Sequence, residues 1–372
     1  MKYEGYSIRY PRRRVIRGAL RGGVRLLLRL LARVKIAGEE HLPRGGPLIV
    51  VGNHAAILEA PLMMAVTPWQ IEGLLGMDVP HEAISQVTMG LYGYISIQRG
   101  AVDRRGLTQA LDVLAQGGVV GLYPEGGIWQ QGVPRAKRGV AWLSYHAQAP
   151  VLPMTFVGTE GALEDALRFR RPELTITIGK LIPPAQASVG QHQRAALQAY
   201  ADHVLAAVYD LLPEEKRQRA LLHQDETFEL HIEMYDKRDK KYFSETRSLP
   251  HGPAVAKFLH SPRILKIFRR NLHFPVEPLE RLHEARDPAA MAEAARSILR
   301  YLREVNPHFL TYRLGFEDGL ATERGLAELL ESLQWAADFK LAVHIQPIWR
   351  HYDPESGEMV TQIEQGRFEH WM

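Results

Sequence analysis

The sequence of 372 residues contains no cysteine. This absence excludes disulfide bonds, zinc ribbons, iron–sulfur clusters and every mechanism that uses a cysteine nucleophile. A metal site would need histidine and carboxylate ligands. However, neither His81-Glu82 nor His283-Glu284 is followed by the second histidine of an H-E-x-x-H zinc helix. A glycine-rich phosphate loop of the nucleotide-binding kind is also missing. We therefore expect neither a metal nor a bound cofactor.

Long uncharged runs are equally scarce. The longest stretch without Asp, Glu, Lys or Arg extends from Gly139 to Thr159 and includes Pro150 and Pro153. This composition is typical of a helix, a turn and a strand rather than of a membrane span. Arginine or proline interrupts every apolar run near the N-terminus, so no signal peptide is predicted there. These features predict a cytoplasmic protein that is not an integral membrane protein of the ordinary type.

Positive charge is concentrated at the start of the chain. Residues 1–35 carry eleven Lys or Arg and one acidic residue, a net charge of +10, whereas the whole chain carries +4. The remaining residues therefore sum to −6, which argues against a core that binds nucleic acid. With 46% apolar and 24% charged residues, the composition is that of a globular protein with a sizeable core.

The basic segment predicts an amphipathic helix over residues 11–34, within a first segment 1–34. Its arginines fall on one helical arc and its apolar side chains on the opposite arc. Such a helix fits the cytoplasmic face of an anionic membrane, where each arginine contributes about 1 kcal/mol. The alternatives are a surface helix that packs its leucines on the core, with solvated arginines, and an arm that binds nucleic acid or a protein. The arginines on the arc are Arg14, Arg17, Arg21, Arg25, Arg29 and Arg33.

The pattern from residue 34 to about residue 211 alternates between strands and helices, which indicates an α/β sheet with flanking helices. Asp103 is suited to cap a helix that ends at Gly117-Gly118. Pro153 lies within an apolar run, and a proline there predicts an edge strand or a loop junction. Short apolar runs or alternating residues predict strands at 47–51, 119–123, 151–157 and 174–178.

A boundary is predicted at residues 212–216, where the sequence reads Leu-Pro-Glu-Glu-Lys. The chain then divides into the segment 1–34, a middle domain 35–211 and a C-terminal accessory region 213–372 with α+β character. No chemistry is indicated for this last region. Its predicted strands are 228–234 and 341–349, and its predicted helices are 288–304 and 322–337.

His54 and Glu59 follow the predicted strand at 47–51, which leads into Gly52-Asn53. A separation of five residues places two side chains about 140° apart on a continuous helix. The pair can therefore meet only if His54 lies in a loop and Glu59 in the first turn of the next helix. A carboxylate there would orient the imidazole and leave its other nitrogen as a general base. A buried histidine beside a helix-capping glutamate is the structural alternative.

Three further features could carry chemistry. The Pro-Glu-Gly-Gly turn at 124–127 presents Glu125 and backbone N–H groups at a strand end, where α/β sites usually lie. Arg99 ends an apolar alternation, and its planar fork matches phosphate oxygens. Lys137 adds positive charge close to the turn. Taken singly, these residues also fit an ordinary turn and an ordinary charged surface.

Together, these motifs resemble the blocks of the glycerophospholipid acyltransferases, the 1-acylglycerol-3-phosphate acyltransferase family. Asn53-His54-x4-Glu59 is similar to the catalytic N-H-x4-D block, and Ile97-Gln98-Arg99 is similar to the second block. Tyr123-Pro124-Glu125-Gly126 resembles the third block, F-P-E-G, and Val151-Leu152-Pro153 resembles the fourth. The order and the spacing agree, and the resemblance covers residues 34 to about 210.

The resemblance implies the glycerolipid acyltransferase fold, a central mixed sheet flanked by helices. It also implies transfer of a fatty acyl group from acyl-CoA or acyl carrier protein to a hydroxyl of a lysophospholipid such as lysophosphatidic acid, without a cofactor. His54 would be the general base, and Glu59 would orient it. The backbone N–H groups near Gly126-Gly127 would be candidate donors to the oxyanion. The residues implied in substrate binding are Arg99, Glu125, Gly126, Gly127 and Lys137.

Three positions depart from the family pattern. Glu59 stands where an Asp is usual, and acyltransferases that act on glycolipids also use Glu there. Ala55-Ala56 replaces a small polar residue, and Gly127-Ile128 replaces a Thr-Arg pair. Transfer to a glycolipid or another non-phosphate acceptor is therefore the main alternative. Thioester hydrolysis and a catalytically inactive module that binds a membrane or a partner are the others.

Overall fold

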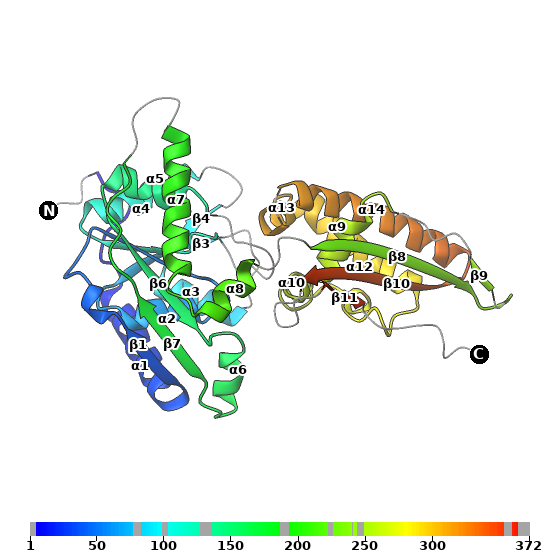
Figure 1. Ribbon diagram of the computed structural model, residues 1–372, viewed down its shortest axis with the longest axis horizontal. Helices are drawn as coiled ribbons and strands as arrows, with labels where there is room; N and C mark the ends of the chain where they lie inside the picture. Colours follow the sequence, from blue (N-terminus) through cyan, green and yellow to red (C-terminus); the bar gives the residue numbers. More distant parts are fainter. Residues whose placement is uncertain are drawn as a thin grey trace. The chain divides into compact units, whose positions relative to one another are not determined.

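The computed structural model divides into two compact units, which are described separately (Figure 1). Within the described part of the chain, unit 1 extends to Leu221 and unit 2 begins at Glu226. The described residues are 5–76, 83–98, 103–126, 136–186, 193–221, 226–239, 241–243, 249–314, 316–352 and 359–363.

Unit 1 is built on a sheet of seven strands in the order β1-β7-β6-β2-β5-β3-β4, counted over the described residues. The five strands from β6 to β4 are parallel to one another, β7 runs antiparallel to β6, and β1 is parallel to β7. The predicted α/β class with a central mixed sheet is confirmed. The strands are β1 (Arg33–Ala37), β2 (Leu48–Gly52), β3 (Ile71–Gly76), β4 (Ile95–Ile97), β5 (Val119–Leu122), β6 (Val151–Val157) and β7 (Glu173–Ile178).

Helices cover both faces of this sheet, because successive strand residues point to opposite sides. In β2, Ile49 and Val51 pack into a core with α4, α5 and α7, whereas Leu48 and Val50 pack into a second core with α2. The helices are α1 (Arg14–Leu31), α2 (Glu59–Val66), α3 (Ala83–Tyr92), α4 (Arg104–Ala115), α5 (Gly139–Ala147), α6 (Ala162–Leu167), α7 (Gln193–Tyr209) and α8 (Glu214–Leu221), with a short 3-10 turn at Glu39–His41.

Local sequence signals place several of these elements. The Asp103 side chain accepts a hydrogen bond from Gly106 N at the start of α4, which is the predicted cap. This helix ends just before Gly117-Gly118, as predicted. The predicted strand 151–157 coincides with β6, and the strand predicted at 174–178 is one residue longer.

Pro153 lies in an interior strand, so the prediction of a sheet edge is wrong. Strand β6 pairs with β2 on one side and with β7 on the other. The ladder with β7 begins at Met154, and Gly179 N donates to Pro153 O just beyond its end. The missing N–H of the proline therefore falls where the ladder stops, which explains why a central strand tolerates it.

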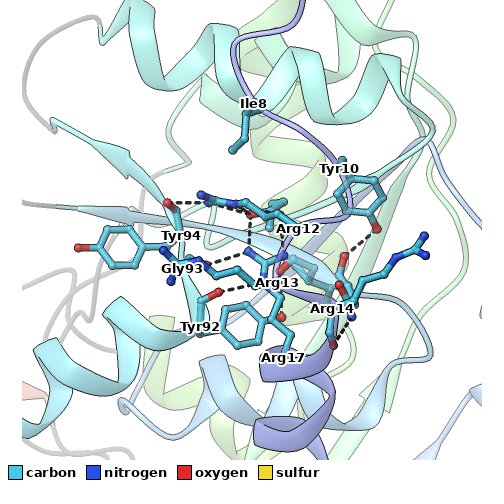
Figure 2. A network of polar contacts seen from close by, with 12 residues as sticks. Ile8, Tyr10, Arg12, Arg13, Arg14, Arg17, Tyr92, Gly93 and Tyr94 are labelled. Atoms are coloured by element: carbon cyan, nitrogen blue, oxygen red, sulfur yellow. Dashed lines mark hydrogen bonds and ion pairs between the residues drawn. The ribbon is translucent and has the colours of Figure 1, made fainter. Parts of the chain in front are cut away.

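Helix α1 is amphipathic, as predicted, but its arginine face turns toward the protein. Arg17 is fully buried and forms a bidentate ion pair with the fully buried Glu72 of β3, with N–O distances of 2.5 and 2.7 Å. Arg12, which precedes the helix, contacts the same carboxylate at 3.0 Å. Figure 2 shows both guanidinium groups in a network with the backbone carbonyls of Tyr92 and Tyr94.

The next two arginines of this face form hydrogen bonds with the backbone of α2. Arg21 Nε donates to Met64 O at 2.8 Å, and Arg25 Nε donates to Ala65 O at 2.6 Å. Both carbonyls belong to the last turn of α2, where carbonyls lack helical partners and the helix dipole favours cations. The expectation that the arginine face meets a membrane or solvent is therefore wrong for Arg17, which is fully buried, whereas Arg21 and Arg25 bond to α2 and stay partly or largely exposed.

Unit 2 consists of a four-stranded antiparallel sheet, β11-β10-β8-β9, packed against helices around its own core, as far as its residues are described. The strands are β8 (Thr227–Asp236), β9 (Lys241–Phe243), β10 (Ala342–Tyr352) and β11 (Met359–Ile363). The helices are α9 (Gly252–Leu259), α10 (Pro262–Leu272), α11 (Glu277–Glu280), α12 (Pro288–Arg300), α13 (Phe309–Leu314) and α14 (Phe316–Asp338), with a π-helical turn at Tyr301–Val305.

Helices capable of crossing a bilayer do not occur in the described part of the chain. Within the same residues, no cluster of three or more His, Asp or Glu side chains could hold a metal ion.

Candidate active site

The carboxyl ends of β2 and β5 lie side by side because Val51 pairs with Leu122 in register. In an open α/β sheet, ligands bind at this edge. The residues that follow β2 are Asn53 and His54, and those that follow β5 are Tyr123 to Gly126. The sheet therefore brings the first and third sequence motifs together.

His54 and Glu59 are in contact, in the one arrangement that their spacing allows. His54 lies in the loop after β2, and Glu59 is the first residue of α2. The distance from His54 Nδ1 to Glu59 Oε2 is 2.7 Å. The histidine side chain is 18% exposed and the glutamate side chain 0%. Nε2 of His54 is thus the ring nitrogen that Glu59 leaves for proton transfer.

The Glu59 carboxylate is fully buried but well supplied with donors. Its Oε1 accepts the backbone N–H of Ala55 at 3.1 Å and that of Ala56 at 2.8 Å. The hydroxyl of Thr159, which follows β6, donates to the same oxygen at 2.6 Å. These three donors fix the position of the carboxyl group, whose other oxygen orients His54. No local pattern in the sequence indicated Thr159, since it lies 100 residues from Glu59.

Asn53 fixes the loop that carries His54. Its Nδ2 donates to Phe156 O at 3.0 Å, and Phe156 N donates to its Oδ1 at 2.8 Å. This reciprocal pair joins the end of β2 to β6 in place of two backbone ladder bonds. The asparagine beside the histidine therefore has a structural role, which is to hold the start of the loop that carries His54.

Tyr123 lies flat against His54. The ring centroids are 4.0 Å apart and the planes are inclined by 11°. Burial, together with the charges of Glu59 and Glu125, raises the pKa of the Tyr123 phenol well above its ordinary value, so the phenol stays neutral. Within the described residues, its buried hydroxyl has no hydrogen-bond partner.

Glu125 is 2% exposed and lies in the same cluster. Burial raises its pKa from 4.5 to about 8. The Tyr209 hydroxyl donates to Glu125 Oε1 at 3.1 Å, and a hydrogen bond from the His54 backbone also favours the ionised form, whereas the charge of Glu59 opposes it. Tyr209, at the end of α7, is a second site residue that the sequence analysis missed, because nothing local links it to the turn.

The turn after β5 is closed by a hydrogen bond from Gly126 N to Tyr123 O at 2.9 Å. Gly126 has φ +79°, a backbone conformation that glycine adopts without strain. Its N–H is thus already engaged, so in this conformation it does not serve as the predicted oxyanion donor. Lys137 N donates to Pro124 O at 2.8 Å, which places Lys137 beside the turn with an exposed side chain. Arg99 and Gly127 lie outside the described residues.

An imidazole that is held through Nδ1 by a buried carboxyl group, and whose Nε2 is not used in that contact, forms a general-base arrangement. Nothing in it requires a nucleophilic side chain. The same geometry serves the removal of a proton from a hydroxyl group or from water.

The chain was also compared with known protein families, curated proteins and solved structures. Residues 33–157 match the model of the family described as Acyltransferase, which confirms the resemblance predicted from the four motifs. One solved structure that is similar to this chain is the 1-acyl-sn-glycerophosphate acyltransferase PlsC from Thermotoga maritima. The identity is 18% and the TM-score 0.39, over 54% of this chain and 82% of that one. The search of curated proteins found no match for the chain.

Proposed function

We propose that this protein is an O-acyltransferase that moves a fatty acyl group from acyl-CoA or acyl carrier protein to a hydroxyl of a lysophospholipid such as lysophosphatidic acid. The observation that carries the proposal is the 2.7 Å contact between His54 Nδ1 and Glu59 Oε2, at the carboxyl edge of the sheet. It lies within the segment 33–157 that matches the acyltransferase family.

His54 Nε2 removes the proton of the acceptor hydroxyl while the oxygen attacks the thioester carbonyl. Glu59 holds the ring through Nδ1 and stabilises the imidazolium that forms. The tetrahedral intermediate collapses when the carbon–sulfur bond breaks, and the leaving thiolate takes the proton from His54. The products are an ester and a free thiol, and no covalent bond to the enzyme forms.

The head group of the acceptor is assigned by the family resemblance to the residues around the turn. Arg99 and Lys137 supply positive charge for a phosphate, and Glu125 supplies a hydrogen-bonding carboxyl group. At neutral pH, a Glu125 with a pKa of about 8 is largely protonated, so it adds little negative charge against an anionic acceptor. Gly127 remains a candidate oxyanion donor.

We also propose that the protein acts at the cytoplasmic face of a membrane, through residues 11–34. The apolar side of α1 supports this proposal, because Arg17, Arg21 and Arg25 on the opposite side bond to groups within the protein. A lysolipid acceptor and its diacyl product both reside in such a membrane, so a protein bound to the membrane is close to its substrate.

The test is a transfer assay with the purified full-length chain, acyl-CoA and a panel of lysolipids in vesicles. We expect thiol release together with a new diacyl lipid, and loss of both in His54→Ala. His203→Ala is the matched control, because His203 is an exposed histidine of α7 away from the site. Wild-type turnover by a folded His54→Ala protein would overturn the proposal.

The panel also separates the alternatives. A glycolipid acceptor is included because Glu59 and Gly127-Ile128 depart from the usual pattern. Free fatty acid without an acceptor would identify a thioesterase. If no acyl transfer occurs with either acyl-CoA or acyl carrier protein as donor, the chain is a binding module rather than an enzyme.

A further inference from the structure

The outward face of α1 is apolar and uncovered. Arg17, Arg21 and Arg25 bond to groups within the protein, and five large aliphatic side chains on the opposite side of the helix are between 43% and 85% exposed. A helix of a soluble domain usually shows the opposite arrangement, with its apolar stripe in the core. The exposed side chains are Val15, Ile16, Leu26, Leu27 and Leu30.

A second apolar group lies on α6 and the residue pair that follows it. Leu163 and Leu167 are four residues apart, so they share one side of the helix, and they are 59% and 69% exposed. Phe169 is 79% exposed and has φ +58°, a left-handed conformation that is uncommon for a bulky side chain. The backbone thus holds a phenylalanine outward at a conformational cost.

The two groups are neighbours in unit 1. Arg171 donates to the carbonyl of Arg29 at 3.3 Å, and Arg33 N donates to Pro172 O at 2.9 Å. From there, β1 and β7 run side by side in parallel. The end of α1 and the segment that leaves α6 therefore meet, and Figure 1 shows α1 and α6 at the same end of the sheet.

Charged side chains border this apolar surface, and arginines outnumber acids in the segment 163–171, which has three arginines beside Glu164 and Asp165. Arg29 and Arg168 are exposed and have no ion-pair partner among the described residues, whereas Arg170 contacts Asp165 at 3.3 Å. Apolar side chains beside uncompensated arginines match the two layers of a bilayer interface, since acyl chains lie below a plane of phosphates.

We propose that the outer face of α1 and the segment 163–171 form a single lipid-contact surface, which inserts into an anionic bilayer. The segment 163–171 is a membrane element separate from the N-terminal helix. This surface contains none of the residues assigned to proton transfer, so its test is independent of the transfer assay.

The absence of cysteine permits a direct measurement. Single variants Leu30→Cys, Phe169→Cys and Phe339→Cys are labelled with a polarity-sensitive fluorophore. Phe339 is the control, because it is 59% exposed but belongs to unit 2. With vesicles of phosphatidylcholine and phosphatidylglycerol, we expect a blue shift and quenching by lipid-borne nitroxides at positions 30 and 169 only.

Binding to the same vesicles gives an independent measure. Leu167→Ser/Phe169→Ser should weaken sedimentation with vesicles about tenfold or more, since two large apolar side chains would no longer leave water on binding. Phe339→Ser should have no effect. Insertion at position 30 without insertion at 169 would overturn the composite surface. If no label responds and the protein forms dimers that Leu30→Ser disrupts, a second copy covers the face and the proposal is wrong.

Discussion

Two buried carboxyl groups share the candidate site, and their surroundings differ. One oxygen of Glu59 accepts hydrogen bonds from two backbone N–H groups and from Thr159, and the other contacts His54. Glu125 accepts a hydrogen bond from Tyr209, and burial raises its pKa to about 8. At neutral pH Glu125 is therefore largely protonated, which limits its repulsion of the neighbouring Glu59 carboxyl group.

The raised pKa of Glu125 predicts a pH dependence of stability. Its pKa is about 8 in the folded chain and about 4.5 when unfolded, so the folded state binds the proton more tightly. The stabilisation is fully present below pH 4.5 and is lost as the pH rises through 8. Relative to Glu125→Gln, the wild type should lose up to about 1.4 kcal/mol per pH unit in this window. Urea denaturation of both proteins from pH 5 to 8 measures the difference, and parallel curves would contradict it.

Tyr123 offers a second residue-level prediction. Tyr123→Phe keeps the ring that stacks on His54 and removes only the hydroxyl, which is buried and has no partner within the described residues. An unsatisfied buried hydroxyl costs about 1–3 kcal/mol, so the variant should be at least as stable as the wild type. If this hydroxyl donates to bound substrate, kcat/KM should fall about tenfold, as expected for one lost hydrogen bond. An unchanged kcat/KM would show that only the ring matters.

The contact between α1 and β3 depends on a buried ion pair, and this dependence can be measured. Glu72→Gln would leave the fully buried guanidinium of Arg17 without its counter-charge. Breaking a buried pair in this way typically costs about 3–5 kcal/mol, whereas replacing both partners with apolar residues is often neutral. We therefore expect Glu72→Gln to be strongly destabilised and Arg17→Met/Glu72→Leu to recover most of the loss in urea denaturation. Wild-type stability of Glu72→Gln would contradict this role.

Which face of α1 packs on the protein could not be predicted from the sequence. Helical spacing correctly placed arginines and leucines on opposite faces, but it could not determine which face is inward. The apolar face of an amphipathic helix usually packs on the core. In α1 the arginine face does so, because its partners are Glu72 and the last carbonyls of α2, which lie 40 to 55 residues away. Without those partners, the arginines would be expected in water or at a lipid surface.

Within the sheet, local patterns predicted most elements, since apolar runs and capping residues act at short range. The strand at 151–157 and the cap at Asp103 agree with the structure. The meeting of His54 and Glu59 was also predicted, because it depends on one loop and one helix start. Thr159 and Tyr209 were missed for the opposite reason, since only the tertiary fold brings them to the site.

The two units have separate hydrophobic cores. Each buried cluster within the described residues draws its members from one unit, with two clusters in unit 1 and one in unit 2. Every described residue of the candidate site, from Asn53 to Tyr209, belongs to unit 1. A unit that has its own core can in principle fold alone.

A chain shortened to residues 1–221 is therefore expected to fold and to keep the proposed chemistry, because it retains both cores of unit 1 and the His54–Glu59 pair. Circular dichroism with thermal unfolding tests the fold, and the acyl-transfer assay tests the activity. An insoluble or unfolded fragment would show that unit 1 needs unit 2 for stability. A folded fragment that binds vesicles but transfers no acyl group, beside an active full-length chain, would instead assign part of the reaction to unit 2.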